Sequence, residues 1–351
     1  MDGLSPTGML LAASPFQGEA ALHVGRQHAR QHTLKSPIHC VGVGVHSGLR
    51  VSLVLRPAAP GTGIVFRRTD LDNSPSNRDI PARFDFVSDT RLCTVLSDPA
   101  APARAIGTVE HLMAALSGAG IDNARIELDG PEVPILDGSA APFLFLIRCA
   151  GTVAQPAPRG RIEILRPVRV SDGDAFAELL PPSAMGHGRF DMAMSIDFDA
   201  PAIGRQALSL TLSEDSFRTE LAEARTFALA SDIARLHEAG LARGGSLENA
   251  IVVDGEKVLN PGGLRMADEF VRHKLLDAVG DLALAGAPIA GRFVAHRSGH
   301  ALNNRLLRAL FADASAWRRT GGGLAEKTLA EPGRSRVVPA RRSPELALSA
   351  A

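Results

Sequence analysis

The segment from Asp268 to Ala285 carries side chains that could bind a metal ion on one face of a predicted helix. His273 and Asp277 are four residues apart, and residues at this spacing lie on the same side of an α-helix. Asp281 extends the same polar stripe by one more turn. Imidazole and carboxylate suit zinc, and a catalytic zinc commonly takes three protein ligands and leaves a fourth position for water. The helix supplies two ligands, so the pattern requires a third from elsewhere.

The same helix has an apolar stripe that should face the core of its own domain. Its members recur at helical spacing and are Val271, Leu275, Ala278, Leu282 and Ala285. At about 100° per residue, the polar stripe begins about 200° from Val271 and so should face away from that core. Gly280 beside the polar stripe would allow another element to approach closely, and Lys274 lies on its flank. The alternative is a surface helix with scattered charges.

Further histidines lie next to groups that could assist hydrolysis. His111 directly follows Glu110 in a helix predicted over 108–116, with Thr108 as its N-cap. A zinc hydrolase needs a base beside the metal-bound water, and a histidine with a neighbouring carboxylate meets that need. His300 lies in a glycine-containing turn before a predicted helix, where it could act as a mobile acid.

The composition excludes several classes of protein. The 351 residues carry 38 basic and 38 acidic side chains, so a nucleic-acid-binding protein is not expected. Tyrosine is absent and there is one tryptophan, which argues against an aromatic binding platform. Three scattered cysteines predict neither a disulfide framework nor a CxxC zinc site, and they fit the reducing cytoplasm. We expect no signal peptide and no transmembrane helix, because the long apolar run and the basic N-terminal region are missing.

Strands and helices alternate without a strict βαβ rhythm, which favours an α+β fold over a doubly wound sheet. Strands are predicted at 51–55, 63–67, 123–128, 161–170, 190–198, 250–253 and 291–295. Helices are predicted at 108–116, 141–150, 231–239, 268–285 and 303–311. Residues 155–161 contain two prolines and a glycine and are the expected linker between two domains. We expect domains over 32–156 and 161–311, a variable extension over 1–31 and a disordered tail over 318–351.

Eight ordered segments resemble a known enzyme family. They are GVGVHSG (42–48), SDTRLCT (88–94), GTVEHLMAAL (107–116), DNARIELDGPEVPILDGSAAPF (122–143), ARTFAL (224–229), GLARGGSLENAIVVD (240–254), VLNPGGLRMADEFVRHKLLDAVGDLAL (258–284) and SGHALNN (298–304). The chain resembles the UDP-(3-O-acyl)-N-acetylglucosamine deacetylases, zinc amidases of lipid A biosynthesis, over about residues 33–311. The resemblance implies two similar α+β domains, each a β-sheet layered on two α-helices, with the active site between the helix layers.

The resemblance also assigns roles to individual residues. The implied zinc ligands are His111, His273 and Asp277. The implied catalytic residues are Glu110 as general base, His300 as general acid, Asp281 orienting His300, and Lys274 and Thr226 contacting the substrate and the developing oxyanion. The implied substrate-binding residues are Cys93, Phe227, Ile233, Leu247, Val252 and Lys274, of which Ile233, Leu247 and Val252 match an apolar passage for the acyl chain. Ordinary core packing is the alternative for Cys93 and the passage residues.

The implied reaction is hydrolysis of the N-acetyl group of a UDP-3-O-(hydroxyacyl)-N-acetylglucosamine, the committed step of lipid A biosynthesis. Zinc is the only implied cofactor, and the acylated UDP-sugar is the implied partner. We expect a cytoplasmic monomer with at most peripheral membrane association. A zinc amidase that deacetylates another N-acetylated sugar is the second hypothesis. A binding protein with a degenerate site is the third, but the sequence retains Glu110 and all three implied ligands.

Overall fold

The first half of the chain builds a five-stranded sheet with one buried face. The computed structural model describes residues 29–71, 79–184, 186 and 188–321. The strand order is β2 (Ile38–Val43), β3 (Arg50–Pro57), β9 (Ala124–Leu128), β4 (Ile64–Arg68) and β5 (Ile80–Pro81). Val51, Leu53 and Leu55 of β3 are fully buried and the residues between them are not, which is the period-two pattern of a strand with one face on a core.

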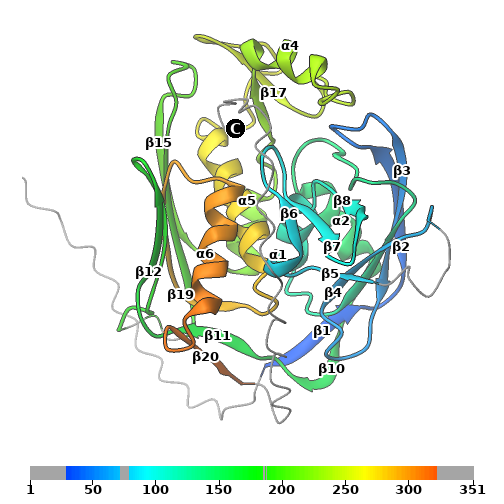
Figure 1. Cartoon of the computed structure of the whole chain (residues 1–351), viewed down its shortest axis with the longest axis vertical. Coiled ribbons are helices and arrows are strands. Elements are labelled where there is room, and N and C mark those ends of the chain that lie inside the picture. Colours follow the sequence, from blue (N-terminus) through cyan, green and yellow to red (C-terminus); the bar gives the residue numbers. More distant parts are fainter. Residues whose placement is uncertain (1–28, 72–78, 185, 187, 322–351) are drawn as a thin grey trace, which may run out of the picture.

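Helices and smaller sheets complete this half. Helix α1 (Glu110–Gly118) packs against α2 (Ala141–Ala150), and α2 contacts β2. A 3₁₀ turn, η1 (Phe84–Phe86), precedes a three-stranded sheet of β6 (Val87–Asp89), β7 (Val95–Asp98) and β8 (Ala101–Ile106). Strands β1 (Arg30–Leu34) and β10 (Thr152–Pro158) form an antiparallel pair. In Figure 1 this pair runs along the bottom of the molecule.

The second half builds a seven-stranded sheet. Its main path is β12 (Val168–Asp172), β13 (Ala175–Leu180), β19 (Ile289–His296), β11 (Arg161–Ile164) and β20 (Trp317–Thr320). Strand β14 (Phe190–Asp197) also pairs with β19, and β15 (Arg205–Thr211) pairs with β14. Helix α5 (Glu269–Ala283) packs on β14 and β15, and α6 (His300–Ala312) packs on β12 and β13.

A small subdomain lies between β15 and α5 in the sequence. Helix α3 (Glu214–Ser216) runs into a π-helical turn, η2 (Phe217–Leu221). A three-stranded sheet of β16 (Phe227–Leu229), β17 (Ile251–Asp254) and β18 (Lys257–Val258) follows, with α4 (Ala230–Glu238) after β16. Figure 1 places α4 and β17 at the top of the molecule.

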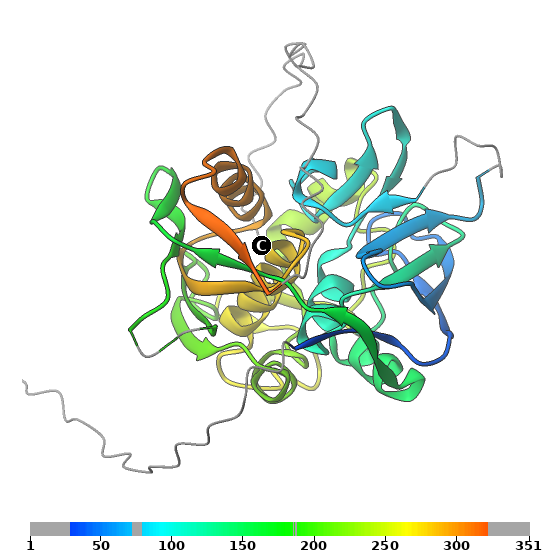
Figure 2. The ribbon, with the colours of Figure 1, turned by 90° about the horizontal axis from the view of Figure 1, so that it is seen from below.

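The helices of the two halves meet in the centre. Figures 1 and 2 show α1, α5 and α6 between the green sheet of the second half and the blue sheet of the first half. Helix α5 is therefore buried on both sides, by its own sheet and by α1, and both its apolar and its polar stripes are buried. The expected α+β class is confirmed. No helix within the described ranges is both long and apolar enough to cross a membrane.

Two helix starts differ from the sequence-based expectation. Helix α1 begins at Glu110, and Thr108 is not its N-cap because its hydroxyl donates instead to the carboxylate of Glu132. Helix α6 begins at His300 rather than at Asn303. His300 is therefore a buried residue in the first turn of a helix and not part of a mobile turn.

Several strands were not expected. Strand β10 covers most of the expected linker at 155–161, and its two prolines are tolerated because β10 pairs on one side only, with β1. The single strand expected over 161–170 is two strands, β11 and β12. Residues 318–320 of the expected tail lie in β20, and residues 30–31 of the expected extension lie in β1. Residues 1–28 and 322–351, which make up most of the two segments, fall outside the described residues.

Candidate active site

Three buried side chains from the two halves converge where α1 meets α5. His111 comes from α1, and His273 and Asp277 come from consecutive turns of α5. Oδ1 of Asp277 lies 3.5 Å from Nε2 of His111 and 3.4 Å from Nε2 of His273. This is the only group of its kind found in the part of the chain that the structure describes, and its ligand atoms all lie within 4.8 Å of one another.

The three side chains fit a zinc ion. Ligand atoms at 2.0–2.2 Å from a tetrahedral zinc lie about 3.3–3.6 Å apart, which agrees with both separations from Oδ1 of Asp277. That oxygen is buried and accepts no hydrogen bond from any described residue. Nδ1 of His273 donates to the carbonyl of Ala224 at 3.1 Å, which leaves Nε2 with its lone pair directed at the other ligands. Burial lowers the pKa of His273 to about 4, so its imidazole is neutral near pH 7.

Close packing of α1 on α5 brings the candidate ligands together. Gly280 lies against the first residue of α1, and a Cβ added to it would stand 2.0 Å from the carbonyl oxygen of Glu110. The approach predicted from Gly280 is therefore present, and it is made by the helix that carries Glu110 and His111. The polar stripe of α5 faces this helix rather than solvent.

Glu110 stands beside the candidate metal site in the first turn of α1. It is almost fully buried, and this burial raises the pKa of its carboxyl group above the usual value, despite the opposing charges of His300 and His111. Oε2 accepts a hydrogen bond of 3.0 Å from the backbone N–H of Thr94, and Oε1 lies 3.9 Å from Nε2 of His300. A carboxylate with a raised pKa is the better proton acceptor, as a general base requires.

His300 is held by a carboxylate from α5. Its Nδ1 donates to Oδ2 of Asp281 at 2.8 Å, and Nδ2 of Asn303 donates to the same oxygen at 2.9 Å. Burial by itself would lower the pKa of His300, but the charge and hydrogen bond of Asp281 raise it to about 9. The imidazole is therefore protonated near pH 7 and directs Nε2–H toward the cavity, which is the state a general acid requires.

A cavity of about 400 Å³ contains most of the predicted site residues. Its lining includes Glu110, His111, His273, Asp277 and His300, together with Cys93, Thr226, Phe227, Ile233, Leu247 and Val252. Asp281 and Lys274 are not part of the lining. Asp281 lies behind His300, and Nζ of Lys274 lies 3.7 Å from Oδ2 of Asp277 with no hydrogen-bond partner among the described residues.

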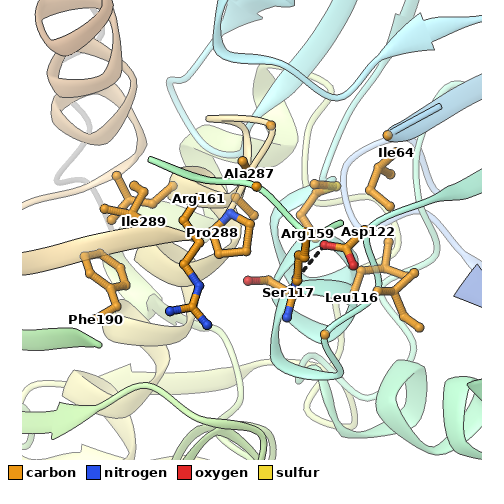
Figure 3. Close-up of a pocket in the computed structure, with 18 of the residues that line it drawn as sticks. Ile64, Leu116, Ser117, Asp122, Arg159, Arg161, Phe190, Ala287, Pro288 and Ile289 are labelled. Atoms are coloured by element: carbon orange, nitrogen blue, oxygen red, sulfur yellow. Dashed lines mark hydrogen bonds and ion pairs between the residues drawn. The ribbon is translucent and has the colours of Figure 1, made fainter. Parts of the chain in front are cut away.

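A larger cavity, of about 870 Å³, lies away from these groups at the C-terminal ends of α1 and α5. Figure 3 shows Arg161 pointing into it and Arg159 paired with Asp122. Arg161 donates a hydrogen bond of 3.0 Å to the carbonyl of Gly188. This cavity contains none of the candidate metal ligands, so we place the chemistry in the smaller cavity.

Sequence reasoning missed several residues that support the site. Thr94 binds both Glu110 and Asp281, and the carbonyl of Ala224 orients His273. Glu132 accepts hydrogen bonds from Thr108 and from the backbone of His46, where a loop of the first half reaches the cavity. These contacts join residues far apart in the sequence, so no local spacing pattern could have indicated them.

A candidate metal triad, a buried carboxylate base and a protonated histidine around one cavity define a candidate metal-dependent hydrolase. The family model described as UDP-3-O-acyl N-acetylglycosamine deacetylase (LpxC) matches residues 31–312. The chain belongs to this family.

Curated relatives carry the same name. The UDP-3-O-acyl-N-acetylglucosamine deacetylase of Phenylobacterium zucineum (strain HLK1) is 52% identical over 288 residues, which cover 82% of this chain and 95% of the relative. The enzymes of the same name from Myxococcus xanthus (strain DK1622) and Idiomarina loihiensis (strain ATCC BAA-735 / DSM 15497 / L2-TR) are 51% and 50% identical. Each of these two alignments covers 82% of this chain, with 88% and 92% of the respective relative.

Proposed function

We propose that this chain hydrolyses the N-acetyl group of a UDP-3-O-acyl-N-acetylglucosamine and releases acetate, as a zinc-dependent step of lipid A biosynthesis. The observation that carries the proposal is the buried triad of His111, His273 and Asp277, with Glu110 on the wall of the same cavity, in a chain about half identical to deacetylases of that name. The spacing of the three ligand atoms and the unpartnered oxygen of Asp277 support zinc.

The side chains would divide the proton transfers between them. When bound, zinc would supply a Lewis acid for the acetamide carbonyl and lower the pKa of a water molecule to about 7. Glu110 takes a proton from the attacking water. The hydroxyl of Thr226, on the cavity wall, donates to the developing oxyanion. His300 donates its Nε2 proton to the leaving nitrogen as the C–N bond breaks, and Asp281 stabilises its charge before that step.

The rest of the cavity would bind the substrate. Phe227 lies edge-on to Phe198 and Phe270, so its ring is fixed in place as a wall for the sugar. Ile233, Leu247 and Val252 supply apolar surface for the acyl chain, and Cys93 lies close to the catalytic groups. Lys274, close to Asp277, balances the charge of that ligand, and its direct contact with the substrate remains a prediction.

The cellular setting is part of the same proposal. The three cysteines form no disulfide among the described residues, which suits a protein that works in the cytoplasm. We propose that it acts as a monomer, because all three candidate ligands come from one chain. Contact with a membrane would be peripheral and would serve to collect an amphipathic substrate.

The test is acetate release from UDP-3-O-(hydroxyacyl)-N-acetylglucosamine by the untreated enzyme, after chelation, and after zinc is restored to about one equivalent. We expect activity to disappear on chelation and to return with zinc. A folded protein that releases no acetate under any of these conditions would contradict the proposal.

The second candidate is deacetylation of a different N-acetylated sugar. Leu247 and Leu259 lie on the cavity wall and are each 43% exposed, so the apolar part of the cavity is open to solvent. An acyl chain held in so open a passage would be enclosed incompletely, and the second candidate requires that it contribute little to binding. UDP-N-acetylglucosamine without an acyl chain distinguishes the two candidates. Equal kcat/KM for the acylated and non-acylated sugars would support the second.

A further inference from the structure

Thr94 connects the candidate base Glu110 with Asp281, the carboxylate that holds the candidate acid His300, through one hydrogen bond to each. Its backbone N–H donates to Oε2 of Glu110 at 3.0 Å. Its hydroxyl lies 2.6 Å from Oδ1 of Asp281 and is the donor in this hydrogen bond, because the carboxylate oxygen is the acceptor. The residue is 1% exposed and lies just before β7, in the half that also carries α1.

Together with the 3.9 Å approach of Glu110 to His300, these contacts form a closed ring of four residues, in which Thr94 takes part through both its backbone and its side chain. Glu110 approaches His300, His300 donates to Asp281, Asp281 accepts from Thr94, and Thr94 donates back to Glu110. Two members come from each half of the molecule. Within this ring, Thr94 provides the hydrogen bond that joins Asp281, on α5, to the first half.

The two oxygens of Asp281 have different tasks. Oδ2 accepts hydrogen bonds from His300 and Asn303, and Oδ1 accepts one from Thr94. A carboxylate fixed at both oxygens cannot rotate about its terminal bond without losing a buried hydrogen bond, and such a loss is costly. The hydroxyl of Thr94 therefore fixes the plane of Asp281 and, through it, the direction in which His300 presents its proton.

We propose that Thr94 is a positioning residue that sets the acid His300 relative to the base Glu110. It is not a catalytic residue, because it does not line the cavity that holds the candidate site. The inference rests on the proposed function, since it assumes that His300 and Glu110 act in one reaction.

Thr94→Val is the central variant because it keeps the shape of the side chain and the backbone N–H and removes only the hydroxyl. We expect kcat to fall about 10- to 100-fold, the usual effect of removing an outer-shell partner in such a site. KM should stay within about twofold, because an interaction that orients the acid acts in the transition state rather than on substrate binding. Thr94→Ser restores the hydroxyl and should recover most of kcat.

Thr33→Val is the matched control for loss of a buried hydroxyl. Thr33 is 5% exposed in β1, its hydroxyl donates to the carbonyl of Asn123 at 2.6 Å, and it lies outside the candidate site. This variant should lose stability and keep kcat. If Thr94→Val reduces kcat no more than Thr33→Val does, or if Thr94→Ser is as slow as Thr94→Val, the positioning role is wrong.

A measurement without turnover separates this inference from the proposed function. The Nδ1–H proton of His300, bound to Asp281, should give a downfield proton NMR signal that disappears in His300→Gln. We expect the signal to shift in Thr94→Val and to keep its position in Thr94→Ser and Thr33→Val. If the signal does not shift in Thr94→Val, the positioning role of Thr94 is wrong, whether or not the wild type is active. If the wild type is inactive but the signal shifts in Thr94→Val, only the proposed function is contradicted.

Discussion

Substitution of Gly280 by alanine tests whether the contact between α1 and α5 sets the geometry of the candidate metal site. The new Cβ would stand 2.0 Å from the carbonyl oxygen of Glu110, 2.8 Å from its carbonyl carbon and 3.1 Å from its Cα. All three atoms are backbone, so no flexible side chain can move aside. Because Cβ contacts below 3.0 Å are essentially never observed, the helices must separate locally by about 1 Å or more.

That displacement acts directly on the candidate ligands. His111 is next to Glu110 on α1, and Asp277 is one turn before Gly280 on α5. The 3.5 Å separation between Nε2 of His111 and Oδ1 of Asp277 spans the two helices and should lengthen, whereas the 3.4 Å separation between His273 and Asp277 lies within α5 and should not. We therefore expect weaker zinc binding and a loss of kcat of about 100-fold, which is typical of a 1 Å misplacement.

The substitution should also reduce stability. Overpacking a well-packed core costs about 1–3 kcal/mol, and each kcal/mol lowers Tm by about 2–4 °C for a domain of 150–250 residues. Gly262→Ala is the matched control, because no atom lies within 4 Å of its added Cβ and its φ is not positive. The assay compares kcat, bound zinc per chain and Tm for both variants. A Gly280→Ala enzyme with native zinc content and native kcat would refute the reasoning.

Three further predictions follow from the charges of the site and the core. Glu110→Gln should reduce kcat about 10²- to 10⁴-fold while zinc content, measured by metal analysis, stays at the wild-type level; normal turnover would exclude Glu110 as the base. The raised pKa of His300, about 9, means that the acid is protonated below pH 9, so kcat should fall as the pH rises through about 9. His300→Gln should be slow and should lack this alkaline limb, and an unchanged kcat–pH profile would exclude the acid role. Glu269 is fully buried, and its carboxylate forms an ion pair of 2.8 Å with Arg225. Burial by itself would raise the pKa of Glu269, but the hydrogen bonds from Arg225 and from the backbone of Arg265 hold this pKa below its usual value. Its contribution to stability is therefore present above about pH 4.5 and lost as the pH falls through the folded-state pKa. Glu269→Gln should lower the free energy of unfolding, measured by urea denaturation, by about 3–5 kcal/mol at pH 7 and by less under acid conditions. An equal loss of stability at both pH values would contradict the sign of this pKa shift.

The sequence predicted the fold class and most of the long elements. The periodic apolar residues of α5, α1 and α2 and the alternation in β3 and β14 give a strong local signal, and these elements lie within a few residues of their expected ranges. The weak points were β10, which lies in the expected linker, β20, which lies in the expected tail, and the break between β11 and β12. Strands β10 and β20 pair with β1 and β11, which lie far away in the sequence. Because β20 is formed by pairing with β11 rather than by its own polar residues, its existence could not be inferred locally.

The candidate site likewise combines side chains that the sequence predicted with contacts that it could not predict. The spacing of His273 and Asp277 predicted two candidate ligands on one helix face, because residues four apart on a helix are neighbours. The adjacency of Glu110 and His111 in the sequence indicated a base next to a candidate ligand. Only the tertiary structure brings His111 to Asp277, holds His300 against Asp281, and connects Thr94 to Asp281 across 187 residues of sequence. The close approach that Gly280 permits, and the burial that shifts the pKa values of Glu110 and His273, arise when the two halves pack together. The sequence by itself determined which side chains could do the chemistry, whereas the packing of α1 on α5 decided their distances and protonation states.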